Sequence, residues 1–371
     1  MEKAEIRKNA ADMIYLTACA INGKKPKQAR IDALDLPKLF EVCQEHILTA
    51  CVAYALESVG VKDKAFVQAK EKAIRKNIIL DAERRNILRR LEAEKIWYMP
   101  LKGAILKDWY PKLGMRQMSD NDILFGGAER SHIKDIMLDL GFECNHYGNK
   151  NDDAYFKAPV CNFEMHTSLF SSAHIGNLYD YFNNVEKRLI KDENNDYGHH
   201  FSNEDFYLFM TAHEYKHFTG LGTGVRSLVD TYIFLRKFNG RLDWRYINTE
   251  LKKLGISEFE RQNRELAIKV FSMKQLTIED KRLLCDYVMS GAYGTKEKAL
   301  KNSIEYRGNG SKVRYIIYRF LPPSGYLEES VPWVKKSKLL VPLALVYRFI
   351  RAARIRFKNN SFSKKKCTAL S

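Results

Sequence analysis

Residues 101–125, LKGAILKDWYPKLGMRQMSDNDILF, contain the pattern that decides the fold and the chemistry. Asp120 and Asp122 stand two positions apart, directly before the apolar residues 123–125, and this pattern predicts a strand that begins at residue 120. Side chains at positions i and i+2 of a strand leave the same face of the sheet. Both carboxylates can then approach one hard cation, and a magnesium ion that holds substrate phosphates needs only one or two protein carboxylates.

Lys102 and Gly103 precede this pair in a strand–turn–helix pattern. The apolar residues 96–101 predict a short strand, and residues 104–109 predict the start of a helix. A glycine turn between a strand and a helix can present backbone N–H groups to a phosphate. We therefore expect this turn to bind phosphate groups of a ligand.

A second strand carries further candidates for the site. Residues 160–166 alternate in the manner of a strand, with Cys161, Phe163 and Met165 on one face. The other face carries Asn162, Glu164 and His166, so Glu164 is a candidate for a third metal ligand. The alternative is a surface strand with one polar face turned to water, which is common in antiparallel sheets.

The rest of the chain indicates an α+β fold, with a small mixed β-sheet between N-terminal and C-terminal helical regions. We expect four parts: a helical region, the sheet-bearing core, a second helical region and a basic, disordered tail, at residues 1–94, 95–200, 201–358 and 359–371. Helical patterns in the two helical regions cover residues 37–56, 64–94, 225–238, 242–255, 257–273 and 277–290.

Within the core, short strands alternate with helices. Besides the segments above, strand patterns occupy residues 142–146 and 155–157, and a helix is expected over 129–140. His199 and His200 lie in residues 192–202, which are rich in Asn, Asp and Gly. We expect a solvated loop there.

The composition describes a folded protein of the cytoplasm. The chain has 371 residues, of which 45% are hydrophobic, and it contains no run near the roughly 20 apolar residues that span a bilayer. Its first residues lack the apolar core of a signal peptide. The seven cysteines are scattered without a C-x-x-C pair, which indicates reduced, structural thiols.

The positive charge is concentrated at the C-terminal end. Residues 296–371 contain 18 Lys and Arg against 4 Glu, which gives +14 of the total net charge of +17. Such a field attracts phosphates, anionic lipid or nucleic acid without distinguishing among them. Residues 338–357 join an apolar run to an Arg-rich one, so this segment either contacts an anionic surface or docks on the core as a helix with solvated arginines.

These motifs together resemble a known family. The elements Leu-Lys-Gly at 101–103, Arg116-x-x-Ser119-Asp120-x-Asp122 and Glu164-x-His166 are similar to those of bacterial nucleotidyltransferases of uncharacterised substrate, within the polymerase-β-type superfamily. The resemblance continues through residues 208–235 and into residues 319–352, so it covers most of the chain.

The resemblance implies roles for individual residues. Asp120, Asp122 and Glu164 would be the catalytic carboxylates that bind metal. Lys102, Gly103, Arg116 and Ser119 would bind the nucleotide, with Arg116 and Ser119 either steadying phosphates or bracing the loop. Many superfamily members carry Gly-Ser in this loop, whereas Gly103 is followed by Ala104, which removes a hydroxyl. His166, His213, His217, Arg226 and Asp230 would line the accessory part of the site.

The implied reaction is the transfer of a nucleoside monophosphate from a nucleoside triphosphate, such as ATP, to an acceptor. Two Mg²⁺ ions would assist it, and three carboxylates are about what such a pair requires. The likeness suggests a small molecule, a saccharide or a peptide as the acceptor, while the basic C-terminal part leaves RNA open. A non-catalytic nucleotide-binding or membrane-surface scaffold is the other alternative.

A competing motif lies at residues 213–217, HEYKH. It fits H-E-x-x-H, in which two histidines on one helix face bind zinc and the glutamate acts as a base. Asp230 is a conceivable third ligand for such a zinc peptidase. The other reading places His213, His217, Arg226 and Asp230 beside the nucleotide or acceptor, or in a His–Asp contact between two helices.

Overall fold

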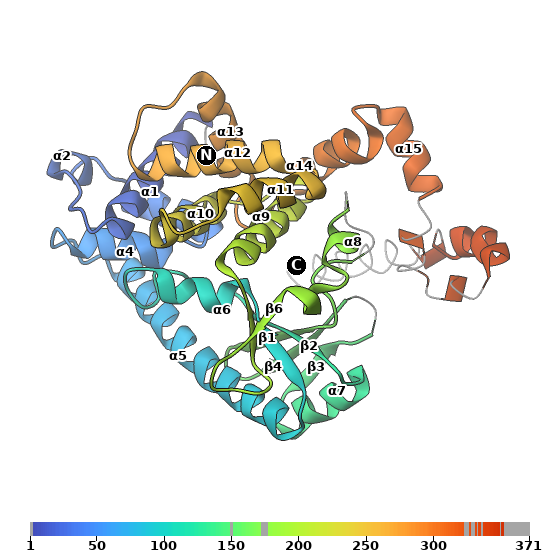
Figure 1. The fold of residues 1–371 in the computed structure, drawn as a ribbon. Helices are drawn as coiled ribbons and strands as arrows, with labels where there is room; N and C mark the ends of the chain where they lie inside the picture. The colour runs from blue at the N-terminus through green and yellow to red at the C-terminus, as the bar shows by residue number, and fades with distance from the viewer. Residues whose placement is uncertain are drawn as a thin grey trace, which may run out of the picture. The chain divides into compact units, whose positions relative to one another are not determined.

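The computed structural model describes residues 3–148, 151–171, 177–322, 326–327, 331, 333–334, 337–348 and 350–351. The chain divides into two compact units, Met1–Asn302 and Ser303–Ser371. The first unit contains every element that carries the expected chemistry. Its α+β architecture, a mixed sheet flanked by helices, confirms the expected fold class (Figure 1).

The N-terminal region is helical, as the sequence predicts. Its helices are α1 Lys3–Ile21, α2 Gln28–Ile31, α3 Leu36–Glu45, α4 Thr49–Glu57 and α5 Lys64–Ala93. The apolar side chains of the first four helices form a core with Phe66 of α5 and with residues from the later helices.

One continuous helix over residues 37–56 was the wrong expectation, because the chain breaks between α3 and α4. Ile47 adopts φ +56°, and the N–H of Leu48 donates to the carbonyl of Cys43 at 2.9 Å, which closes α3. His46 in this break is buried, and its Nδ1 accepts a hydrogen bond from the N–H of Val225 at 3.3 Å. His46, at this break, contacts Val225 at the start of a later helix. The helical periodicity of residues 37–56 does not predict this contact.

The five-stranded sheet has the order β1-β2-β5-β4-β3. Only β2 and β5 pair in parallel among the described strands, and the other neighbours are antiparallel. The strands lie within a residue or a few of their predicted positions, at β1 Trp97–Pro100, β2 Asn121–Gly126, β3 Glu143–His146, β4 Asp152–Lys157 and β5 Cys161–His166. Between them lie α6 Lys102–Leu106, the 3₁₀ turn η1 Lys107–Trp109 and α7 Arg130–Asp139.

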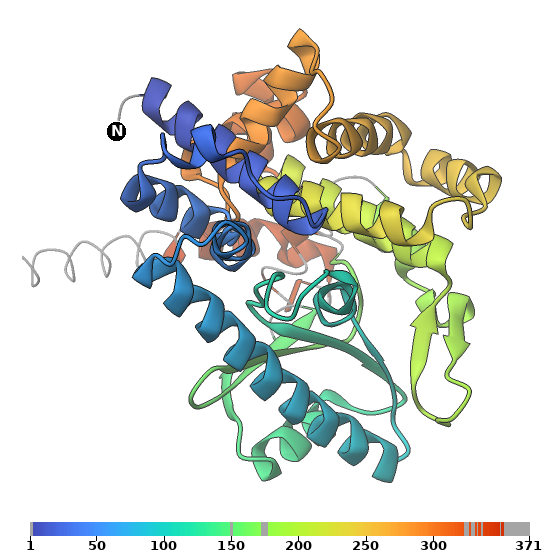
Figure 2. The same ribbon diagram turned by 90° about the vertical axis from the view of Figure 1, so that its left-hand side faces the viewer.

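Each face of the sheet belongs to a different core. Alternate residues such as Ile123, Phe125 and Phe163 pack with Leu80, Ile87 and Leu91 of α5 and with α7. Figure 2 shows α5 crossing this face. On the opposite face, Met99 and Leu124 pack with α6 and with α9, Asn203–Thr219. Asp122, two residues before Leu124, therefore belongs to the face away from α5.

The helices after the sheet cover this second face and join the N-terminal core. They are α8 Leu178–Phe182, η2 Val185–Arg188, α9 Asn203–Thr219, α10 Val225–Phe238, α11 Trp244–Leu254, α12 Ser257–Phe271, α13 Ile278–Ser290 and α14 Lys296–Asn302. The expected loop at His199 and His200 is wrong in part, because β7 His199–Phe201 pairs with β6 Leu189–Lys191. Short hairpins of this kind need few apolar residues, so the polar composition concealed it.

The second unit contains the π-helical turn η3 Ser303–Arg307, α15 Lys312–Phe320, the 3₁₀ turn η5 Lys338–Leu340 and a helical stretch at residues 341–348. These last two fall within the expected segment 338–357, whose end lies outside the described residues, as does the expected disordered tail 359–371. None of the described helices is long and apolar enough to cross a membrane.

Candidate functional site

The parallel pairing of β2 and β5 brings together the acids that the sequence separates by more than forty positions. Asp122 lies opposite Glu164, and Leu124 lies opposite His166, in the same register. Because side chains alternate along a strand, Asp122, Glu164 and His166 share the sheet face away from α5. The β-strand expected over 160–166, with its two faces, is confirmed by the alternating burial of Cys161, Phe163 and Met165.

Three side chains form a compact group with metal-ligand chemistry. One ligand atom from each of Asp122, Glu164 and His166 lies within 4.8 Å of the others. The Nε2 atom of His166 is 3.6 Å from Oδ1 of Asp122 and 3.7 Å from Oε2 of Glu164. Among the described residues, this is the only group of three or more such side chains. Sequence reasoning assigned His166 to an accessory role, and it missed how closely this side chain approaches the acids.

Asp120 lies one residue before β2 and acts on the group through its charge. Burial, then the neighbouring Asp122, raises the pKa of Asp120 to about 6. Burial followed by Asp122 and Asp120 likewise raises the pKa of Glu164 to about 7. Crowded carboxylates resist ionisation in the absence of a counter-charge, so the three acids form a site that gains from a bound cation.

Several polar atoms of the group have no hydrogen-bond partner among the residues that the structure describes. They are Oδ1 of Asp122 and both ring nitrogens of His166, all shielded from solvent. More than nine in ten buried polar groups in proteins are hydrogen-bonded, so a cluster of exceptions requires a cause. The donor set fits a divalent cation, since carboxylate oxygens and a neutral imidazole nitrogen are all metal ligands.

Arg116 and Asp230 form a buried ion pair beside the site. Arg116 donates from Nε and Nη2 to the two carboxylate oxygens of Asp230, at 2.8 and 3.0 Å, and the hydroxyl of Tyr110 donates to the same carboxylate at 2.7 Å. Burial by itself would raise the pKa of Asp230, but Arg116 outweighs it and holds that pKa at about 2. The remaining Nη1 of Arg116 donates to the carbonyl of Gly103 at 3.4 Å. These are the contacts of a residue that braces the 102–103 turn.

Gly103 packs against this arginine. A Cβ atom at Gly103 would lie 3.3 Å from Nη1 of Arg116 and 3.3 Å from Cε of Met118, which leaves little room for a side chain. Lys102, at the first position of α6, makes no hydrogen bond or ion pair within the described part of the chain, although the charges of Asp230 and Glu214 act on it. Burial lowers the pKa of Lys102, and the two carboxylates oppose that effect.

The segment that leads into β2 is held from two sides. The Nζ atom of Lys76, on α5, donates to the carbonyl of Ser119 at 2.7 Å. Arg226, on α10, donates from Nη1 to the carbonyl of Gln117 at 3.2 Å. Both cations also act on the charge of Asp120. Sequence reasoning missed Lys76, whose position on a long charged helix gives no local signal, and it missed Tyr110.

The HEYKH segment lies in α9. The rings of His213 and His217 are 4.6 Å apart, centroid to centroid, as expected for positions i and i+4 of a helix. Glu214 between them points into the helical core, where it accepts hydrogen bonds from Tyr287 at 3.1 Å and Thr231 at 3.4 Å. Asp230, the conceivable third zinc ligand, is occupied by Arg116. The described residues thus give the histidines neither the base nor the third ligand of a helical zinc site.

His213 lies close enough to the acid-bearing face to respond to it. Burial lowers the pKa of His213 well below its usual value, and positive charges on Lys216, His217, Lys102 and His166 add to this effect. His213 is therefore a neutral imidazole at physiological pH. Of the cationic side chains on α6, α9 and α10, Arg226 of α10 is the one whose charge acts on Asp120.

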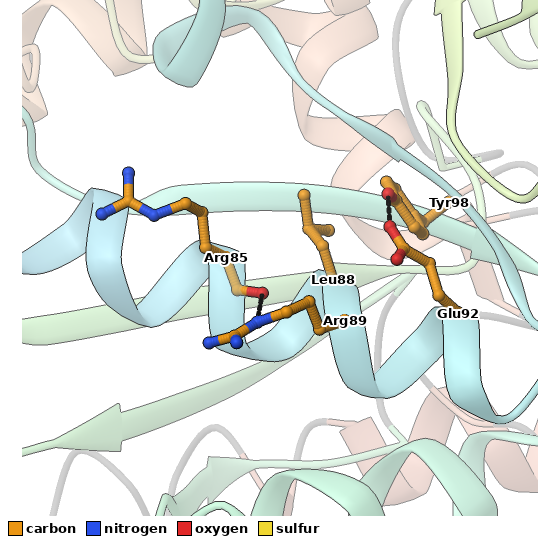
Figure 3. A pocket seen from close by; sticks show the side chains of 5 residues that line it. All are labelled: Arg85, Leu88, Arg89, Glu92 and Tyr98. Carbon is orange, nitrogen blue, oxygen red and sulfur yellow. Dashed lines mark hydrogen bonds between the residues drawn. The ribbon is translucent and has the colours of Figure 1, made fainter. Parts of the chain in front are cut away.

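A separate hollow of about 410 Å³ lies on the α5 side of β1 (Figure 3). It is lined by Arg85, Leu88, Arg89, Glu92 and Tyr98. Glu92 accepts hydrogen bonds from Tyr98 and Asn195, and the two arginines are exposed. Tyr98 packs with the α5-facing core, so the hollow lies on the opposite face of the sheet from Asp122.

Comparison with known proteins identifies the family. A family model described as uncharacterised nucleotidyltransferase matches residues 32–272, more than half of the chain and all of the five-stranded sheet. A search of curated proteins and a search of solved structures each gave no match. The matched range contains Asp120, Asp122, Glu164 and the braces that surround them, and the chain therefore belongs to the family of uncharacterised nucleotidyltransferases.

Proposed function

We propose that this protein transfers a nucleoside monophosphate from a nucleoside triphosphate to an acceptor, with divalent metal held by Asp120, Asp122 and Glu164. The observation that carries the proposal is the opposition of Asp122 and Glu164 across the parallel strands β2 and β5, within the range matched by the family. The two carboxylates are crowded, and Oδ1 of Asp122 has no hydrogen-bond partner among the described residues, so a bound cation would relieve their mutual repulsion.

Bound magnesium ions, two in the mechanism we propose, would supply electrostatic stabilisation of the attacking and leaving oxygens. Side chains of the protein would hold these ions and bind the substrates. Asp122 and Glu164 would hold the ion that activates the acceptor hydroxyl, and Asp120 with Asp122 would hold the ion on the triphosphate. Lys102 has no hydrogen-bond partner among the described residues and offers its ammonium to a phosphate. Arg226 neutralises part of the charge near Asp120, while Arg116 keeps the 102–103 turn in place.

The acceptor is proposed to be a small molecule, a saccharide or a peptide. Most of the excess positive charge, +14 of +17, lies in residues 296–371, outside the matched range 32–272. RNA as the acceptor would give binding that falls steeply with salt, because each phosphate contact releases counterions. Binding that depends weakly on salt would support the smaller acceptors.

The test is a titration of the purified protein with each of the four nucleoside triphosphates in the presence of Mg²⁺, followed by thermal unfolding and pyrophosphate release. We expect one triphosphate to raise the unfolding temperature in a magnesium-dependent manner, and the shift to disappear in Asp120→Ala. No response to any triphosphate would overturn the proposal. Stabilisation by zinc that is lost in His213→Ala would favour a helical zinc site instead.

A further inference from the structure

The side chain of His166 stands where a ligand to the proposed metal would stand. Parallel pairing sets His166 one step beyond Glu164 on the same face, and its Nε2 lies 3.6 Å from Oδ1 of Asp122 and 3.7 Å from Oε2 of Glu164. These separations are too long for a hydrogen bond. They are short enough for the three atoms to share one cation.

Without a cation, a protonated His166 ring would be the counter-charge of Asp122 and Glu164, at 3.6 and 3.7 Å, and no hydrogen bond among the described residues ties the ring to another group. Both ring nitrogens are shielded from water and, within the part of the chain that the structure describes, neither has a hydrogen-bond partner; the same holds for Oδ1 of Asp122. A histidine kept only for packing would leave two buried polar atoms without hydrogen bonds, which is unfavourable. A histidine that coordinates a cation uses one of these atoms, and it relieves the carboxylates at the same time.

The surroundings supply negative charge to such a cation. Asp152 lies directly opposite His166 in the antiparallel register of β4 and β5, and it adds to the field of Asp122 and Glu164 at this ring. Carboxylates near a ligating histidine commonly set its orientation and strengthen it as a ligand.

We propose that His166 is itself a metal ligand, and that it makes the site favour a first-row transition dication over Mg²⁺. This inference rests on the proposed function for the presence of the metal. Oxygen-only sites suit magnesium, whereas one imidazole nitrogen among carboxylates adds a ligand that magnesium uses poorly and transition ions use well. A nitrogen ligand in place of one oxygen ligand therefore changes which ion the site prefers, as well as the affinity for that ion.

The experiment uses the full chain, purified free of metal, with Mn²⁺ as a spectroscopic probe and no nucleotide. Mn²⁺ binding is measured from the signal of the free ion in electron paramagnetic resonance, and Mg²⁺ binding is measured by competition. We expect Mn²⁺ to bind at least tenfold more tightly than Mg²⁺. Spin-echo envelope modulation of the bound Mn²⁺ should show ¹⁴N coupling from a directly coordinated imidazole.

The His166→Asn variant separates a ligand from a packing residue. We expect it to lose the ¹⁴N coupling and to bind Mn²⁺ at least tenfold more weakly, while Mg²⁺ affinity changes by less than about threefold. His132→Asn, at an exposed histidine of α7, is the matched control and should behave as the wild type. Equal losses for both ions, or ¹⁴N coupling that survives in His166→Asn, would overturn the inference.

The outcome is distinguishable from failure of the proposed function. If the protein releases pyrophosphate with Mg²⁺ but shows no imidazole coupling to Mn²⁺, the nucleotidyltransferase proposal is supported and the proposal that His166 is a metal ligand is wrong. If the coupling is present and no triphosphate reacts, the metal ligand is established without the reaction.

Discussion

Arg116 and Asp230 meet through two hydrogen bonds, Nε to Oδ1 at 2.8 Å and Nη2 to Oδ2 at 3.0 Å, although 114 residues separate them in the chain. Their side chains are 6% and 3% exposed, so the pair is desolvated on all sides. It fastens α10 to the turn that precedes the acid-bearing strand. The pair therefore connects the helical region to the geometry of the candidate site.

Removing one partner of this ion pair should be strongly destabilising. Arg116→Met leaves the buried Asp230 carboxylate without its hydrogen-bonded counter-charge, although the charges of Lys102 and Arg226 still act on it. We expect the free energy of unfolding to fall by about 3–5 kcal/mol. Urea unfolding followed by circular dichroism measures the loss. Arg261→Met breaks an exposed pair with Glu258 and should leave the free energy of unfolding nearly unchanged. Similar losses in the two variants would show that Asp230 finds another partner or water.

Neutralising Asp122 should abolish transfer without weakening the fold. In Asp122→Asn the metal loses a charged ligand, while Asp120 and Glu164 lose the neighbour that raises their pKa values. We expect no measurable pyrophosphate release, and a free energy of unfolding in EDTA equal to or above that of the wild type. Asp135→Asn, at an exposed acid of α7, is the control and should retain activity. Full activity in Asp122→Asn would remove Asp122 from the mechanism.

Acid should destabilise the protein through His46. Burial lowers the pKa of this imidazole from 6.5 to about 4, so the unfolded chain takes up a proton more readily than the folded one. The contribution of His46 to stability is therefore complete above pH 6.5 and is lost as the pH falls through 4, by at most about 3 kcal/mol.

The variant His46→Asn tests this pH dependence, because the amide oxygen can still accept the hydrogen bond from the Val225 N–H without titrating. We expect the slope of unfolding free energy between pH 6.5 and 4 to be shallower in His46→Asn than in the wild type. His132→Asn should leave the slope unchanged. An unaltered slope in His46→Asn would assign the acid sensitivity to other groups.

Two glycines should differ sharply in their tolerance of a methyl group. A Cβ at Gly126 would lie 2.2 Å from Cζ2 of Trp97 on the neighbouring strand, so the ring or the strand must shift. We expect Gly126→Ala to lower the free energy of unfolding by about 1–3 kcal/mol. Gly103→Ala meets only side-chain ends at 3.3 Å and should cost about 1 kcal/mol or less. Thermal unfolding of both variants, measured under the same conditions, shows which substitution destabilises the protein more.

Local periodicity predicted the elements well, and long-range contacts explain what it missed. The strand at 160–166 and the long helix at 64–94 follow from the alternation and the apolar stripe of their own residues, and both are confirmed. The break at His46 arises from a bond to Val225, which lies 179 positions later. No pattern within a window of 20 residues records such a contact.

For the candidate site too, local patterns were predicted from the sequence and long-range contacts were not. The spacing of Asp120 and Asp122 and the shared face of Glu164 and His166 are visible in the sequence. The parallel register that sets Asp122 against Glu164 is not, because strand pairing depends on the whole sheet. The sequence likewise did not predict that Arg116 pairs with Asp230, because an arginine beside a phosphate-binding loop can either bind phosphate or brace the loop.

The long helix α5 contributes to two cores at once. Phe66 near its start packs in the N-terminal helical core, while Leu80, Ile87 and Leu91 pack under the sheet. Each residue of an α-helix advances the side chains by roughly 100°, so the two sets of contacts are locked in phase by the number of residues between them. Inserting one residue between positions 67 and 79 would turn one set away from its core. Insertions and deletions within this span should therefore be far less tolerated than substitutions on the helix's exposed side.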